Sequence, residues 1–507
     1  MTRKEFIRLA SRGAASAAAG STFSFDARAA GAETRAQSSE PARSPAAGIT
    51  AAVVSFIAGA RLDRFPDRAL VEAKRCLIDG LGVMLAGSTV RGSQIVHEYV
   101  KSSGGRNEAT VLGRAPTTAP AAQAALANGA SGHAMDYDDT QLSSSPERVF
   151  GLLTHPTVPA LAASLAVGER IGASGRVFLE AFLVGFEVEC KIAEAIDPHH
   201  YLRGFHSTGT IGTFGAAASA AKLLGLQPGA TAHAIGIAAS MSAGIRVNFG
   251  SMTKPLHAGR AAENGVTAAE LASRGFTAGD DGLDGEWGFF QVLGGGADAA
   301  RIVPALGNPL SIVDPGVSFK PYPCGSLGHP TMDAMMQLVT AHDVKPGEIE
   351  RIRVRAGSNI LNPLRYKTAK TELEAKFCLP FMMSSIALRR RAGIREFTDE
   401  FVASAPVQAM MARVETMFDS AIEARGFDKM RSVVEVDVKD GRKLVQPSDD
   451  RYRGGPGRPF TRAELHEKFA DCAGLLLSAE RIRRALDLIE QVERLANVRE
   501  LTQALAP

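Results

Sequence analysis

The sequence has few cysteines, and none of them forms a C-x-x-C pair. This argues against a disulfide framework and against a zinc or iron–sulfur site built from thiolates. We expect each thiol to be a small, buried, apolar side chain. The five residues are Cys76, Cys190, Cys324, Cys378 and Cys472.

An excess of charge and a long apolar run are also lacking. The formal net charge is +3 over 507 residues, which gives no argument for nucleic acid or an anionic membrane as a partner. After the N-terminus there is no run of about 18 uncharged apolar residues, so we expect no membrane insertion. No P-loop and no G-x-G-x-x-G after a strand is found, which excludes the usual dinucleotide and nucleoside triphosphate sites.

Residues 1–48 resemble an export signal of the twin-arginine type followed by a disordered linker. Arg3-Lys4 and Phe6 precede an Ala-rich stretch that ends in a candidate cleavage site. Lys4 stands where the second arginine is expected, and Arg12 interrupts the apolar region. A disordered Ala-rich extension explains the same residues equally well. The location is therefore either cytoplasmic or, if the signal is functional, periplasmic.

The rest of the chain divides by its patterns into three parts. Helical periodicity dominates residues 49–315, where abundant Ala and Gly indicate closely packed helices. Residues 316–455 have α+β character, because Ile349–Ala356 alternates apolar and basic residues and Asp440-Gly441 marks a hairpin. Residues 456–507 are helical again, starting at the capping box Thr461-x-x-Glu464. We predict a mainly α fold in which an all-helical domain, formed by the N-terminal and C-terminal parts, carries an inserted α+β domain.

An acidic stretch, NGASGHAMDYDDT, stands out between apolar segments. It contains His133, Asp136, Asp138, Asp139 and Thr140, and His155 follows it. In a helix, side chains three and four residues apart share one face. Acids and imidazoles gathered on one face suit proton transfer or metal binding. The alternative is a solvated acidic turn.

Two later stretches carry histidine and positive charge. GFHSTGTIGTFG contains His206 in a Gly/Ser/Thr-rich helix entry, which is able to hold an anion or simply to start a helix. In MTKPLHAGR, Lys254, His257 and Arg260 follow at three-residue spacing near a helix start marked by Pro255. A half-buried basic face needs an anionic partner. A carboxylate substrate or one of the upstream aspartates would supply it.

Taken together, these motifs resemble the MmgE/PrpD family. NGASGHAMDYDDT, the THP at Thr154–Pro156, GFHSTGTIGTFGAAASAAKLLGL, MTKPLHAGRAAENG and FKPYPCG occur in one order, and the resemblance runs from about Ile49 to the C-terminus. The family includes 2-methylcitrate dehydratase, cis-aconitate decarboxylase and iminodisuccinate epimerase.

The resemblance implies a lid role for the α+β domain, a homodimer, a small polycarboxylate substrate, and neither metal nor organic cofactor. It implies a shared pocket whose catalytic residues are Asp136, Thr140, His155 and His206. It also places Lys254 and Lys320 there as substrate-binding residues. From the sequence itself we add His257 and Arg260, which share the spacing of Lys254, and His329, which follows the motif of Lys320, as further candidates for substrate binding. The decarboxylase branch places a histidine five residues after the lysine that matches Lys320, and here that position is Gly325.

The chemistry that follows needs cations, a base and an acid. Two or three carboxylates must leave water together, which requires several positive charges. Loss of water beside a carboxylate needs a base for the C–H proton and an acid for the leaving hydroxide. We expect His155 or His206 to be the base, and Asp136 to orient it or to act as the acid. Dehydration ranks first, epimerisation or isomerisation second and decarboxylation third.

Two alternative functions belong to other classes of protein. A metal-dependent hydrolase would use His133, Asp136, Asp139 and His155 as ligands. A non-catalytic carboxylate-binding protein would fit the export-like N-terminus, although two-lobed receptors of that kind usually alternate strands and helices.

Overall fold

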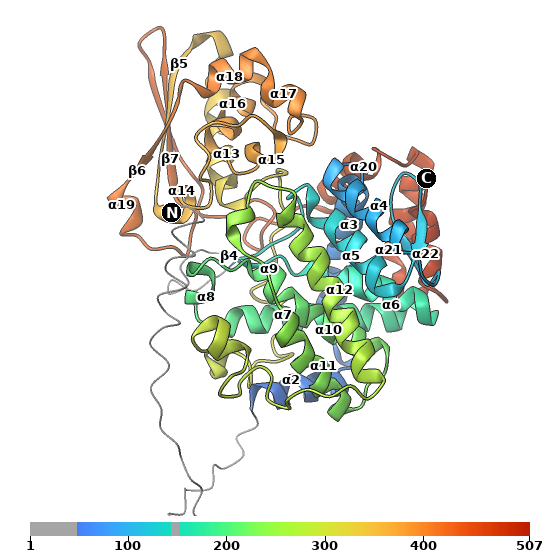
Figure 1. Ribbon diagram of the computed structural model, residues 1–507. Helices are drawn as coiled ribbons and strands as arrows, with labels where there is room; N and C mark the ends of the chain where they lie inside the picture. Colours follow the sequence, from blue (N-terminus) through green and yellow to red (C-terminus); the bar gives the residue numbers. More distant parts are fainter. Residues whose placement is uncertain (1–47, 143–151) are drawn as a thin grey trace, which may run out of the picture. The chain divides into compact units, whose positions relative to one another are not determined.

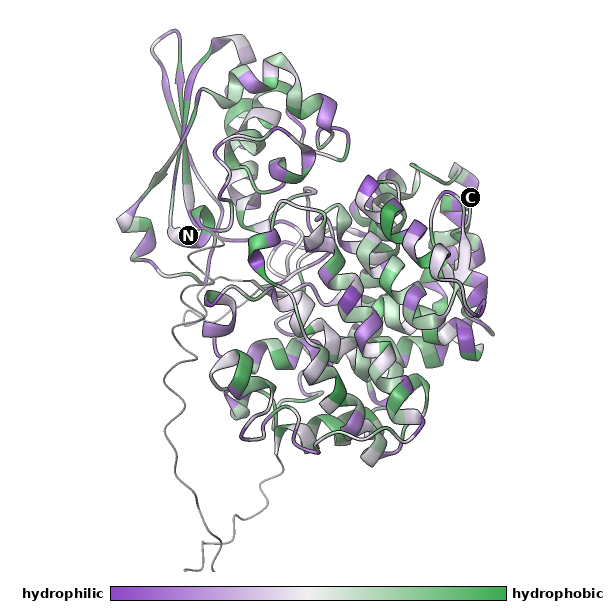
Figure 2. Cartoon of the chain, viewed as in Figure 1, coloured by the Kyte–Doolittle hydropathy of each residue, from purple (hydrophilic) through white to green (hydrophobic). Residues whose placement is uncertain are grey.

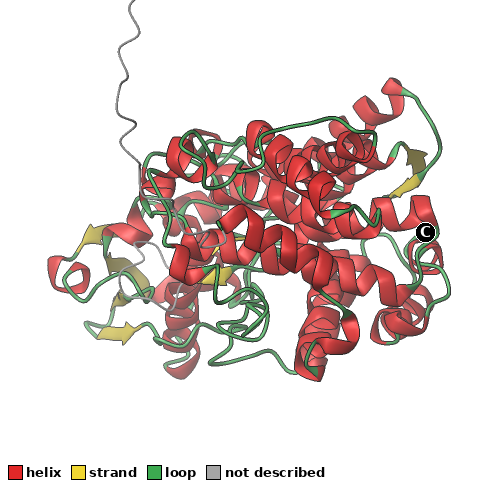
Figure 3. Cartoon of the chain, turned by 90° about the horizontal axis from the view of Figure 1, so that it is seen from below, coloured by secondary structure: helices red, strands yellow, loops and turns green. Residues whose placement is uncertain are grey.

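The computed structural model describes residues 48–142 and 152–507. The export-signal-like segment expected at the N-terminus therefore lies, apart from Gly48, outside the described residues. Among the described residues no helix is long and apolar enough to cross a membrane. The fold is mainly helical, as predicted, and Figure 3 shows strands confined to a few short arrows.

The helical body begins with a series of helices that Figure 1 colours from blue to yellow-green. These are α2 (Ile49–Gly59), α3 (Asp67–Gly87), α4 (Arg91–Ser103), α5 (Ala121–Ala134), α6 (Thr157–Ile171), α7 (Gly175–Ala195), α8 (His199–Leu202), α9 (Ser207–Thr210), α10 (Gly212–Leu223), α11 (Pro228–Met241) and α12 (Thr253–Ser273). The C-terminal helices α20 (Arg462–Ala473), α21 (Ala479–Glu490) and α22 (Arg499–Ala504) return to this body, where α20 and α21 contact α3.

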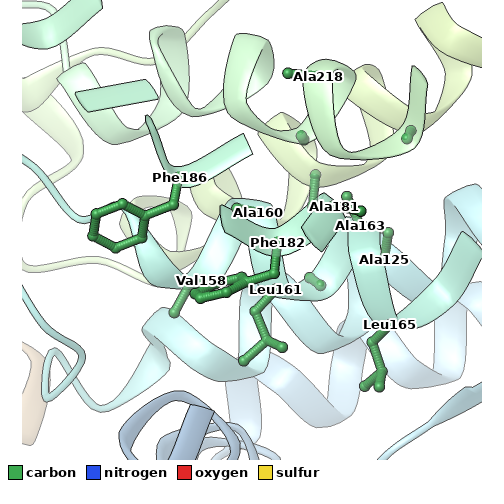
Figure 4. Close-up of a cluster of buried hydrophobic side chains, with 14 of the residues drawn as sticks. Ala125, Val158, Ala160, Leu161, Ala163, Leu165, Ala181, Phe182, Phe186 and Ala218 are labelled. Atoms are coloured by element: carbon green, nitrogen blue, oxygen red, sulfur yellow. The ribbon is translucent and has the colours of Figure 1, made fainter. Parts of the chain in front are cut away.

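Small side chains let these helices approach closely. Figure 4 shows alanines of α5, α6, α7 and α10 beside Phe182 and Phe186, and Figure 2 shows the apolar residues concentrated inside the body. At the crossing of α5 and α12, a Cβ atom at Gly129 would lie 2.9 Å from Cα of Gly259. Only glycine permits this backbone contact. It brings the C-terminal end of α5 next to the start of α12.

The prediction of an all-helical first part was wrong in two respects. Two short antiparallel pairs occur there, β1 (Ala109–Val111) with β2 (Thr117–Ala119), and β3 (Gln141–Leu142) with β4 (Leu152–Thr154). The last α-helix ends at Ser273, well before residue 315, and short 3-10 and π turns follow it. Repeated glycines over residues 275–296 explain the early end, because glycine disfavours continued helix.

The α+β region has its own set of elements. Its helices are α13 (His329–Ala341), α14 (Ser358–Leu361), α15 (Glu372–Ala375), α16 (Leu379–Arg389), α17 (Asp399–Ala403), α18 (Ala405–Met411) and α19 (Ser420–Glu423). Its strands are β5 (Ile349–Ala356), β6 (Val414–Phe418), β7 (Ser432–Val438) and β8 (Lys443–Pro447). They form one sheet in the order β6-β5-β7-β8, parallel only between β5 and β6.

Sequence signals placed several of these elements correctly. β5 spans the alternating segment, and β7 and β8 pair across the expected hairpin. At the start of α20 the Thr461 side chain accepts a hydrogen bond from the Glu464 N–H, and the Glu464 side chain accepts one from the Thr461 N–H. Along β7 the side chains alternate between buried and half-buried, because one sheet face packs on α13 and α16. The two larger hydrophobic clusters of the described residues lie mainly in the helical body and in the α+β region, and a smaller one includes Met135 and Tyr137 beside Asp136.

Candidate active site

Asp136 lies in a buried ion cluster. Its Oδ1 accepts hydrogen bonds from Nζ of Lys254 and Nζ of Lys320, each at 2.7 Å. Burial raises the pKa of Asp136, but the two ammonium groups outweigh burial and hold that pKa well below its usual value. Both ammonium groups share this one carboxylate, and the ionised Asp138 also acts on both of them.

The two lysines differ in their surroundings. Nζ of Lys254 lies 5.3 Å from the ring centroid of Phe249 and 5.4 Å from that of Phe377, a double cation–π contact. Burial lowers the pKa of Lys254, and Asp136 only partly restores it. For Lys320 burial also lowers the pKa, but Asp136 and then Asp138 more than compensate and raise it. Lys254 is therefore the more acidic of the two.

The backbone turn at Asp136 is unusual. The expected helical face does not extend this far, because α5 ends at Ala134 and Asp136 adopts φ +49°. This left-handed conformation is uncommon for a residue with a Cβ atom. Buried ammonium groups hold the turn through its carbonyls: Lys376 donates to Ala134 O, Lys320 to Asp136 O and Lys468 to Tyr137 O. The turn aims the Asp136 carboxylate at both cavity lysines.

His155 and His206 are both buried, and each is fixed through Nδ1. His155 Nδ1 donates to the carbonyl O of Asp139 at 2.7 Å, so its Nε2 carries the lone pair. Nδ1 of His206 lies 3.0 Å from Nδ1 of His257. Burial holds the pKa of His155 and of His206 well below the usual histidine value. Both rings are therefore neutral at neutral pH and able to act as bases.

His133, which we expected in the acidic stretch but did not assign to the pocket, lies against both rings. Its centroid is 4.8 Å from that of His155 and 5.5 Å from that of His206. Its Nδ1 lies 2.7 Å from Oδ2 of Asp138. Burial raises the pKa of Asp138, but His133 and His155 outweigh it and lower that pKa. Asp138 is thus an ionised acceptor that orients His133.

Two other acids near the site are neutral. Asp139 turns toward Thr157, whose N and Oγ1 donate to it at 3.3 and 2.7 Å, and burial with Asp79 raises its pKa to about 8. Burial raises the pKa of Glu189 well above its usual value, and Oγ1 of Thr154 donates to it at 2.6 Å. Neither acid contributes negative charge to the cavity at neutral pH.

One cavity is lined by several of these groups. Its lining combines the ionic cluster, hydroxyl groups and an apolar wall. The lining residues are Asp136, Thr154, His155, Tyr201, His206, Ser207, Thr208, Phe249, Lys254, Lys320, Gly325, Ser326, Leu327, Pro363 and Phe377.

The structure thus brings five predicted site residues to one cavity, although they are separated by up to 184 positions. These are Asp136, His155, His206, Lys254 and Lys320. His257 lies behind His206 and supports its ring. Thr140 pairs through its backbone with Ser318, its N donating to Ser318 O at 2.9 Å, and it does not line the cavity.

Arg260 and His329 lie away from the cavity. Arg260 is half exposed and pairs with Glu263. Residues three apart drift around an α-helix by about 60° per step, so the second step from Lys254 points elsewhere. His329 is buried in the α+β cluster, where its Nδ1 accepts from the Tyr452 hydroxyl at 2.6 Å.

Sequence reasoning missed part of the cavity wall. Ser207 and Thr208 follow His206 directly, so the hydroxyl pair in the HST motif was the available signal. Phe249 and Phe377 had no such signal, because an isolated phenylalanine usually indicates a residue of the hydrophobic core. Their place over Lys254 follows only from the tertiary structure.

The ligand set expected for a metal-dependent hydrolase is not assembled. Asp139 turns toward Thr157, away from His133 and His155. Within residues 48–142 and 152–507, two other groups bring ligand atoms within 4.8 Å of one another: His133 with His155 and His206, and His133 with Asp136 and Asp138.

Comparisons with known proteins agree with the motif order. The MmgE/PrpD N-terminal domain model matches residues 51–302 and the C-terminal domain model matches residues 322–494. Cis-aconitate decarboxylase from Homo sapiens is 27% identical over 468 residues, which cover 90% of this chain and 94% of that protein. The Mus musculus enzyme is 27% identical, covering 90% and 93%. The enzyme from Aspergillus terreus strain NIH 2624 is 22% identical, covering 90% and 96%.

Proposed function

The chain belongs to the MmgE/PrpD family, and on that premise we propose that it is a lyase acting on a small di- or tricarboxylate. The reaction uses acid–base chemistry of the chain's own side chains. The observation that carries this proposal is the convergence of two ammonium groups and a neutral imidazole, from distant parts of the sequence, on one cavity.

Substrate carboxylates bind to Lys254 and Lys320. Both ammonium groups share Oδ1 of Asp136, and because an ammonium group carries three N–H donors, each keeps a donor for an anionic ligand. Hydroxyl groups of Ser207, Thr208 and Ser326 on the same lining supply hydrogen bonds to further carboxylate oxygens. The apolar wall of Phe249 and Phe377 excludes water and strengthens these charge interactions.

His155 is the base that removes the proton beside a carboxylate. Its Nδ1 is fixed on Asp139 O, and the ring lines the cavity with its Nε2 lone pair free to accept the proton. The two lysines stabilise the enolate that forms. Asp136 is ionised, so it fits the role of holding both lysines and not that of the acid. Lys254, whose pKa is lowered, is the group suited to protonate a leaving hydroxide.

Loss of water is the reaction we place first, with epimerisation or isomerisation next, since both begin with the same abstraction. Gly325 lines the cavity where the decarboxylase branch carries a histidine. A Cβ atom there would lie 2.8 Å from Cδ2 of Leu364. The side chain of Leu364 thus occupies space that a histidine would need.

Decarboxylation is the second candidate, because the relatives named above are cis-aconitate decarboxylases. In that case a cavity group protonates the carbanion left by loss of CO₂, and the lysines stabilise it in the same way. Dehydration and decarboxylation would use the same residues of this chain. They differ at Gly325, where the decarboxylase branch carries a histidine.

One experiment separates these reactions. Purified protein is incubated in D₂O with a panel of di- and tricarboxylates, and NMR follows loss of water, epimerisation, CO₂ loss and deuterium incorporation. We expect turnover of at least one acid, strongly reduced in His155→Gln and retained in the control His342→Gln, an exposed residue outside the cavity. Binding of an acid without exchange or turnover would instead favour a carboxylate-binding protein.

The homodimer and the lid role of the α+β region are proposals as well. Light scattering of the purified chain tests the first. The second predicts that ligand binding protects amides near Gly325 and Phe377, which lie in the α+β region and line the cavity, from hydrogen exchange.

A further inference from the structure

Three imidazoles converge beneath the cavity. One ring nitrogen from each of His133, His155 and His206 lies within 4.8 Å of the other two, and all three side chains are buried. They come from the end of α5, the link between β4 and α6, and the residue before α9; α5 packs against α6, and α9 against β4.

Each ring uses Nδ1 for an outer partner. His133 faces the Asp138 carboxylate, His155 the Asp139 carbonyl, and His206 the ring of His257. Metal-bound histidines typically have this arrangement, in which a carboxylate, a carbonyl or another polar group fixes the ring and its tautomer. Because Nδ1 is engaged in each ring, Nε2 is the nitrogen left for a shared ligand.

Two of the three Nε2 atoms lack protein partners among the described residues. Nε2 of His133 and Nε2 of His206 are buried and make no hydrogen bond within the described part of the chain. Buried nitrogens without a partner are costly, so a ligand that satisfies them is favoured.

We propose that Nε2 atoms of His133, His155 and His206 form a binding site for a divalent transition-metal ion of the Zn²⁺ class. Three neutral imidazoles with one open position are a common zinc donor set. Tetrahedral bonds of about 2.0–2.1 Å place ligand nitrogens about 3.4 Å apart, so the rings move inward by roughly 1 Å. The carboxylates of Asp136 and Asp138 offset the charges of Lys254 and Lys320 nearby.

The consequence for catalysis rests on the proposed function. A bound ion occupies Nε2 of His155, the atom assigned as the base, and therefore inhibits the lyase. Metal binding itself does not depend on that assignment. The two ideas can fail separately, because binding is measured without any organic acid.

The test uses full-length protein without a histidine tag. Co²⁺ is titrated while visible absorption is recorded, since four-coordinate Co²⁺ absorbs strongly, and Zn²⁺ is then added to displace it. We expect one ion per chain and displacement by one equivalent of Zn²⁺. The variant His133→Asn keeps a donor to Asp138 but removes Nε2. It should weaken binding at least about 100-fold, because even outer partners are worth about 10–100-fold in affinity.

A control variant and a second site variant complete the binding test. His342→Asn, at an exposed site, should bind Co²⁺ as the wild type does. If His133→Asn unfolds, as melting would show, His206→Asn provides the second test. Absence of saturable binding, or equal affinity in both site variants and the wild type, overturns the proposal. Inhibition of turnover is plotted against the concentration of free Zn²⁺, because polycarboxylates chelate the ion. If the protein binds metal but turns over no acid, only the proposed function is refuted.

Discussion

Nζ of Lys254 and Oδ1 of Asp136 lie 2.7 Å apart, although the residues are separated by 118 positions in the sequence. The close crossing of α5 and α12 makes this possible, because Gly129 and Gly259 let the two backbones touch. Lys254 then starts α12 where the turn after α5 presents Asp136. The ion pair at the cavity is thus a product of helix packing.

Replacing Lys320 with Met should strongly reduce both stability and turnover. Removing Lys320 leaves the buried Asp136 carboxylate with Lys254 as its partner and leaves the Asp136 carbonyl without its donor. The loss should therefore stay below the roughly 3–5 kcal/mol that breaking a buried ion pair outright costs. Denaturant unfolding and steady-state kinetics measure the two losses. Asp136→Asn is the matched comparison and should lose more stability, because it leaves both ammonium groups without a carboxylate; unchanged unfolding of both variants would contradict the ion cluster.

Replacing His155 with Gln should lower turnover by about 10²–10⁴-fold, the usual contribution of one general base. Deuterium exchange into a bound acid should fall in parallel, because exchange requires the same proton abstraction. His206→Gln is the matched comparison. If its exchange falls and that of His155→Gln does not, the base is His206.

Activity should persist at pH values below the range in which a typical histidine base becomes protonated. The pKa of His155 lies well below 6.5 because the ring is buried, so the base stays neutral as the pH falls through that value. The pH dependence of kcat/KM reports this group in the free enzyme. An acidic limb centred near 6.5 would exclude His155 in the environment seen here.

Stability should fall as pH rises toward about 8 because of Asp139. The native state keeps its proton up to about pH 8, whereas an ordinary aspartate releases it near 3.8. Over that interval the unfolded state binds fewer protons, so the free energy of unfolding decreases with pH. Asp139→Asn should flatten this dependence. Glu98→Gln, at an exposed position, is the control and should leave it unchanged.

Replacing Gly325 with Ala should reduce turnover more than stability. The new Cβ atom would meet the end of the Leu364 side chain at 2.8 Å, and that side chain can rotate. Unfolding should change by less than about 1.5 kcal/mol, as in well-tolerated core changes, while the narrower cavity raises KM. Leu364→Ala in the same chain should recover KM. A KM unaffected by either change would mean that substrate does not approach position 325.

Local sequence signals predicted much of the secondary structure. The alternation in β5, the turn before β8 and the capping box of α20 each act over a few residues, and each was correct. The sequence left open whether Asp136 lies in a helix or in a turn, because the buried lysines that stabilise its left-handed conformation come from distant segments. The sequence between Ser273 and residue 315 lacks the helices expected of it.

The sequence by itself determined which residue types were present for acid–base chemistry and, through the order of its motifs, the family. Only the tertiary structure decided that Asp136, Lys254 and Lys320 share one ion cluster, that Arg260 points away and that His133 joins His155 and His206. The physical reason is that charge, tautomer and pKa depend on burial and on partners. Those partners come from segments up to 184 residues apart, which local patterns do not relate.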